Sequence, residues 1–63
     1  MKIGSKVVRI NKNTKPYVWE IVGVSNVFSD CFVCNTEEEP LHHLDRCELR
    51  LATKEEISKN KRI

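Results

Sequence analysis

Glycine, proline and aromatic residues are scarce in this chain. Among its 63 residues, two are glycine, two are proline and four are aromatic. The sequence has neither a phosphate-binding glycine loop nor a paired-carboxylate motif, so we expect no enzymatic activity. No apolar run approaches the roughly 20 residues that span a bilayer, and Met1–Gly4 does not resemble the start of a signal peptide. We therefore expect a cytoplasmic protein without membrane contact.

Cysteines are few and odd in number. With three of them, a disulfide framework would leave one unpaired, and in the cytoplasm free thiols or metal ligands are expected. Cys31, Cys34, His42 and Cys47 supply a tetrahedral zinc set similar to a zinc knuckle of the CCHC type. The alternative interpretation is structural, because Cys31 and Cys34 would point to opposite faces of a regular strand. Cys47 would then be a small buried apolar residue.

The chain is long enough for one domain, residues 1–63, with a thin core. Alternating apolar residues and polar turns predict strands at about 5–10, 17–24, 27–35 and 41–51. The segment Tyr17–Val24 is the most strongly β-forming, and Gly23 predicts a bulge near its end. In the last strand we expect Cys47, Leu49 and Leu51 to point inward, and His42-His43 to lie in a turn before it.

A short helix is predicted at about 54–60. Thr53-Lys54-Glu55-Glu56 is a capping box, in which the Thr53 side chain and the Glu56 side chain each bind the other residue's backbone N–H. Ile57 is the one side chain of this helix that we expect to reach the core. Two turns are not stable alone, so the helix must dock on the strands.

Three segments resemble small SH3-like β-barrels of the KOW and Tudor type, as found in uncharacterised bacterial or phage-encoded proteins. They are the opening Ile3–Val8, the strand around Trp19 and the ending Leu49–Ile57. The resemblance implies a mainly-β fold, an SH3-like small barrel of four to five antiparallel strands with a short C-terminal helix.

Basic residues concentrate at the two ends of the chain. Residues 1–20 contain five basic residues and one acidic residue, and residues 51–63 contain four basic and two acidic residues. In between, residues 21–50 contain two basic and six acidic residues. If the ends meet in space they form a cationic patch, which predicts a non-catalytic module that binds nucleic acid or a protein that handles nucleic acid. The candidate contacts are Lys2, Lys6, Arg9, Lys12, Lys15, Tyr17, Lys59, Lys61 and Arg62.

Two other functions fit the same sequence. The alternative of a protein-interaction or regulatory protein, of bacterial or phage origin, predicts an apolar patch, an exposed strand edge or a homodimer. A metal-stabilised module would use the four candidate zinc ligands named above. Trp19 could either stack on a ligand or pack in the core, and its position in the most apolar segment favours packing in the core.

Overall fold

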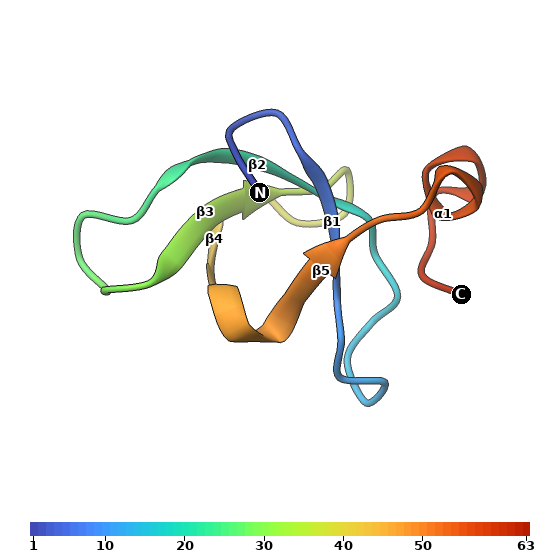
Figure 1. The fold of residues 1–63 in the computed structure, drawn as a ribbon, viewed down its shortest axis with the longest axis horizontal. Helices are drawn as coiled ribbons and strands as arrows, with labels where there is room; N and C mark the ends of the chain where they lie inside the picture. The colour runs from blue at the N-terminus through green and yellow to red at the C-terminus, as the bar shows by residue number, and fades with distance from the viewer.

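A computed structural model describes residues 1–63 as one five-stranded antiparallel sheet with a short helix (Figure 1). The strand order is β4-β3-β2-β1-β5, so β4 and β5 are the edges of a sheet that is not closed into a barrel. The elements are β1 Lys6–Arg9, β2 Trp19–Val24, β3 Cys31–Asn35, β4 His42–Asp45, the 3₁₀ turn η1 Arg46–Glu48, β5 Leu49–Leu51 and α1 Lys54–Lys59.

The inner face of the sheet carries the main core. Val7 lies opposite Trp19 and Ile21 lies opposite Cys34, and both pairs are buried. Paired residues on neighbouring antiparallel strands point to the same face, which is why these side chains meet. The full cluster is Val7, Trp19, Ile21, Phe32, Cys34, Leu44 and Leu49.

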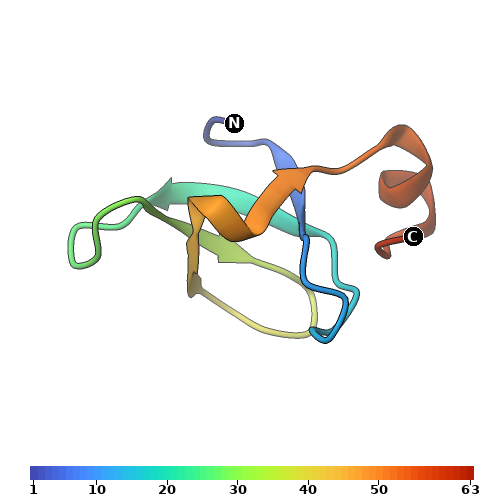
Figure 2. The same ribbon diagram turned by 60° about the horizontal axis from the view of Figure 1, so that its bottom comes forward.

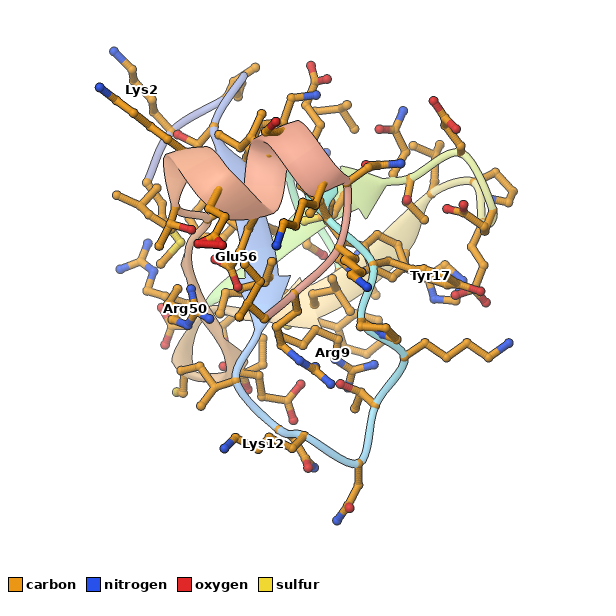
Figure 3. The ribbon with its side chains drawn as sticks, turned by 90° about the vertical axis from the view of Figure 1, so that its right-hand side faces the viewer. Lys2, Arg9, Lys12, Tyr17, Arg50 and Glu56 are labelled. Atoms are coloured by element: carbon orange, nitrogen blue, oxygen red, sulfur yellow. The ribbon has the colours of Figure 1, made fainter.

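The outer face is covered at β1, where the C-terminal segment crosses it. Val8 is fully buried although it points away from the main core, and its cross-strand neighbour Arg50 binds Glu56 of α1. Figure 3 shows α1 in front of β1 with Arg50 and Glu56 beside each other. Val7 and Val8 therefore point to opposite faces, and both are buried because both faces of β1 are covered. Ile10 lies beyond the strand and is exposed.

Two of the predicted strands are shorter or divided in the structure. The region 27–35 is a strand only from Cys31, because Val27 and Phe28 lie in the turn that joins β2 to β3. The region 41–51 is interrupted by η1, which begins where the Asp45 side chain accepts a hydrogen bond from the N–H of Cys47. The predicted bulge in β2 is confirmed by a register shift between Ile21 and Gly23.

Cys47 does not lie in the core as predicted, because it is exposed in η1. Leu49 and Leu51 share the face of Val7, as predicted, but only Leu49 is buried, since Leu51 lies at the sheet edge and is 56% exposed. His42 and His43 belong to β4 and pair with Cys34 and Val33 instead of forming a turn. The predicted alternation runs through Cys47, but η1 interrupts the strand at Arg46–Glu48, so Cys47 does not share the direction of Leu49 and Leu51.

The helix begins as predicted. The Thr53 hydroxyl accepts from the N–H of Glu56 and the Glu56 carboxylate accepts from the N–H of Thr53, so the capping box is confirmed. Its buried residue is Glu56, which is 1% exposed, whereas Ile57 is 45% exposed. The helix docks through a charged residue and not through the predicted apolar one. It is too short to cross a bilayer, and no other helix is present.

Candidate nucleic-acid interface

The loop between β1 and β2, residues 11–16, lies against the C-terminal tail, residues 60–63. The N–H of Arg62 donates to the carbonyl of Pro16 at 2.8 Å, and the Arg62 guanidinium donates to oxygens of the same loop. In Figures 1 and 2 the loop and the C-terminus lie on the same side of the sheet. We call these two segments the loop–tail surface.

The predicted basic residues are only partly brought together. Lys12 and Lys15 in the loop and Lys61 in the tail form no ion pair. Lys2 lies at the other end of the molecule from Lys12 (Figure 3). The tail therefore joins the loop, whereas the extreme N-terminus does not.

Three other candidates are neutralised by carboxylates. The ammonium group of Lys6 lies 2.9 Å from Glu20, Arg9 lies 3.3 Å from Glu48, and Lys59 lies 3.3 Å from Glu55. Exposed pairs of this kind stabilise the fold by only about 0–1 kcal/mol, so a stronger anion can displace them. They nevertheless lower the local positive potential at those three positions.

Tyr17 links the loop to the core. It is partly buried against the main cluster, with its ring centroid 6.1 Å from that of Trp19 in an edge-on arrangement. The Lys15 ammonium lies 5.8 Å from the Tyr17 centroid, within the range of a cation–π contact. Trp19 is 3% exposed, which confirms the expectation that it belongs to the core.

The four candidate zinc ligands are not gathered at one point. Cys34 is buried on the inner face, and Cys31 points to the other face, as the strand period predicted. His42 lies with its ring edge-on to Trp19 at 5.4 Å, and Cys47 is exposed in η1. No group of three or more histidine, cysteine or acidic side chains has an arrangement that could hold a metal ion.

The thiols are held in the protonated form. Burial raises the pKa of Cys34 to about 11. Loss of hydration and then the charges of Asp45, Asp30 and Glu48 raise the pKa of Cys31, and a hydrogen bond to Asp45 raises that of Cys47. A thiol must ionise to act as a nucleophile, so none of the three is activated at neutral pH.

The structure contains a buried polar cluster that the sequence reasoning missed. Both Glu56 oxygens accept from the Arg50 guanidinium, at 2.7 and 2.8 Å, and each accepts one more N–H, from Thr53 at 2.9 Å and from Ile63 at 3.0 Å. Hydrogen bonds from Arg50 and then from the two backbone groups hold the pKa of Glu56 well below its usual range. We call these four residues the Glu56 cluster. The capping box pointed to Thr53 and Glu56, but nothing local in the sequence indicated Arg50 or Ile63.

An apolar projection lies at the opposite end of the long axis. The turn between β2 and β3 extends away from the body in Figures 1 and 2, and it exposes Val24, Val27 and Phe28 by 63%, 75% and 55%. Ser25 shapes this turn because its hydroxyl oxygen accepts from the N–H groups of Val27 and Phe28. We call Val24, Val27 and Phe28 the apolar tip.

Comparison with known proteins gives no relative. No protein-family model matches this chain, and no curated protein or solved structure has significant similarity to it.

Proposed function

We propose that the protein is a non-catalytic module that binds nucleic acid through the loop–tail surface. This proposal rests on one observation. Lys12 and Lys15 form no ion pair with a carboxylate, and they lie in a loop that the basic tail holds in place. Phosphate groups are the ligands that such a concentration of cations attracts, largely independently of sequence. Lys61 adds a third unpaired cation from the tail.

The shape of the molecule supports a polymeric ligand. No pocket indents the surface, whereas small-molecule sites are concave clefts that bury most of their ligand. Tyr17 lies beside Lys15, and an aromatic ring next to a cation is a feature of surfaces that bind single strands. A base that stacks on Tyr17 would displace the Lys15 ammonium toward a neighbouring phosphate.

We also propose that the sheet is an open form of an SH3-like barrel. The first strand, β1, pairs with both β2 and the last strand, β5. Beyond β2, the strands β3 and β4 are added in chain order. The two edge strands, β4 and β5, are joined only by η1, so the connection keeps the ends of the sheet within a few residues of each other. Both features are compatible with a barrel that has not closed.

Titration of a fluorescein-labelled single-stranded oligonucleotide, followed by anisotropy at several salt concentrations, tests the proposed function. Two or three phosphate contacts predict a slope of log K against log salt of about −1.5 to −2. The K12A/K15A double variant should bind more weakly with a shallower slope, and E37Q/E38Q, which alters charge on an unrelated loop, should not lose affinity. Absence of binding by the unmodified protein even at 20 mM salt would refute the proposal.

A second candidate function is supported by the apolar tip. Val27 and Phe28 are held outward by the hydrogen bonds of Ser25, and exposed apolar groups held in one conformation are typical of protein contacts. If the tip mediates association, sedimentation of the unmodified protein should reveal self-association that F28S abolishes. A monomer at all concentrations would remove self-association as the role of the tip.

A further inference from the structure

Arg62 makes the most extensive side-chain contacts of any residue in the loop–tail surface. Its Nη1 lies 3.0 Å from the carbonyl oxygen of Arg9, 2.9 Å from that of Asn11 and 2.9 Å from the Thr14 hydroxyl. Its Nη2 lies 3.3 Å from the carbonyl oxygen of Lys12 and 2.8 Å from that of Thr14. These two nitrogens carry four hydrogens and reach five oxygens, so one hydrogen is shared. Most of the hydrogen-bonding capacity of this guanidinium is therefore used within the protein.

The contacts of Arg62 determine which groups of the loop face outward. The carbonyls of Asn11, Lys12 and Thr14 converge on the guanidinium. The N–H groups of Lys12 and Lys15 are not used in any hydrogen bond within the protein. With its carbonyls turned toward Arg62, the loop retains donors and ammonium groups for a ligand. This polarity suits an anion.

The Glu56 cluster anchors the tail that carries Arg62. The N–H of Lys61 donates to the Glu56 carbonyl, and the N–H of Ile63 donates to the Glu56 carboxylate at 3.0 Å. Arg62 lies between these two anchored residues. The loop is thereby connected through Arg62 to a buried ion pair, which fixes the position of the guanidinium.

We propose that Arg62 is a positioning residue, which holds the loop in its ligand-binding conformation and does not itself contact phosphate. In this account Lys12 and Lys15 make the phosphate contacts. The inference rests on the proposed function for the identity of the ligand, but the effect of Arg62 on the loop can be measured without any ligand. A lysine at position 62 would keep the charge and lose the planar fork that reaches several oxygens at once.

R62K and K12A separate the two roles. Hydrogen exchange of the unliganded protein reports on the amides of Asn13 and Thr14, which donate to Oδ1 and to the carbonyl of Asn11 respectively. We expect exchange at both amides to be at least about tenfold faster in R62K and unchanged in K12A. Affinity for the labelled oligonucleotide should fall about tenfold in R62K at an unchanged salt slope, whereas K12A should reduce the steepness of the slope by about 0.7.

The outcomes distinguish this inference from the proposed function. Unchanged exchange at Asn13 and Thr14 in R62K would overturn the positioning role, whatever the binding data. Faster exchange in R62K with no oligonucleotide binding by any variant would refute the proposed function and leave only the structural contact. A shallower salt slope in R62K would mean that Arg62 contacts phosphate, and the inference would then be wrong.

Discussion

The two ends of the molecule are organised by different interactions. At one end, the tail and the β1–β2 loop are fixed by hydrogen bonds that the Arg50 and Arg62 guanidinium groups donate, those of Arg50 to the Glu56 carboxylate and those of Arg62 to the loop. At the other end, the apolar tip is held by the Ser25 side chain, by the backbone hydrogen bond from Ser25 to Cys31 and by the contact of Phe28 with His43, and Val27 and Phe28 stay exposed. A thin core can thus be extended at one end by an ion pair whose carboxylate is buried, while the other end carries apolar side chains that the core does not use.

Among the variants at the two ends of the molecule, the largest expected effect comes from Glu56. E56Q leaves the Arg50 guanidinium without a charged partner and removes an acceptor from a fully occupied site, so we expect a loss of about 2–3 kcal/mol in the free energy of unfolding. We place the value below that of a fully buried pair because the Arg50 side chain is 41% exposed. The free energy of unfolding of a domain of this size is rarely more than about 3–5 kcal/mol. Urea denaturation should therefore show that E56Q has lost most of its stability.

E55Q is the matched control for that variant. Glu55 neighbours Glu56 on the same helix, but it is exposed and pairs only with Lys59. We expect a change of less than about 0.5 kcal/mol. Equal losses in E55Q and E56Q would contradict the account of the Glu56 cluster.

The same residue predicts the dependence of stability on pH. Because folding lowers the pKa of Glu56, its contribution is complete above the pKa of the unfolded carboxyl, near 4.3, and is lost as the pH falls toward the folded value. The midpoint temperature of thermal unfolding of the unmodified protein should therefore fall below about pH 4. The E56Q protein should lose less of its thermal stability over the same pH range. The two curves of midpoint temperature against pH should therefore approach each other in acid. Parallel curves would show that Glu56 does not carry this dependence.

A smaller effect is expected from Ser25, at the other end. S25A removes the acceptor of the Val27 and Phe28 N–H groups and the contact with Nδ1 of His43 at 2.9 Å. We expect faster hydrogen exchange at those two amides and a loss of about 0.5–1 kcal/mol. S58A on the exposed helix surface serves as the control. The amides of Asn13 and Thr14 should be unaffected in both, since the two ends are independent.

The smallest effect is expected from Phe28. This residue is 55% exposed and touches His43 edge-on at 5.5 Å, so F28A should change the free energy of unfolding by less than about 1 kcal/mol. F32A provides the contrast, because Phe32 is buried in the main core and its loss should cost about 3–5 kcal/mol and unfold the protein. A large loss in F28A would mean that the tip belongs to the core after all.

The sequence predicted those features that local chemistry determines. The bulge at Gly23 and the capping box at Thr53 each follow from a few neighbouring residues and are confirmed, and the strand predicted at about 17–24 is present from Trp19 to Val24. The opposite directions of Cys31 and Cys34 follow from the strand period alone.

Features that depend on distant residues were not predicted. Cys47 was expected in the core because the 3₁₀ turn before Leu49 was not recognised, and Ile57 was preferred to Glu56 because the pairing with Arg50 was not visible. The sequence predicts Arg62 as a ligand contact but does not reveal that its side chain also binds a loop about 50 positions earlier in the chain. Such contacts depend on how the strands bring the ends together, and no short segment of the sequence encodes them.

Chemical-shift mapping of the ¹⁵N-labelled protein with a single-stranded oligonucleotide at low salt tests the central claim most directly, since it reports on both ends at once. The account predicts that the amides of Lys12, Lys15 and Lys61 shift on titration and return as salt is raised, while those of Val27 and Phe28 stay in place. Shifts confined to residues 24–30, or no shifts at either end, would contradict it.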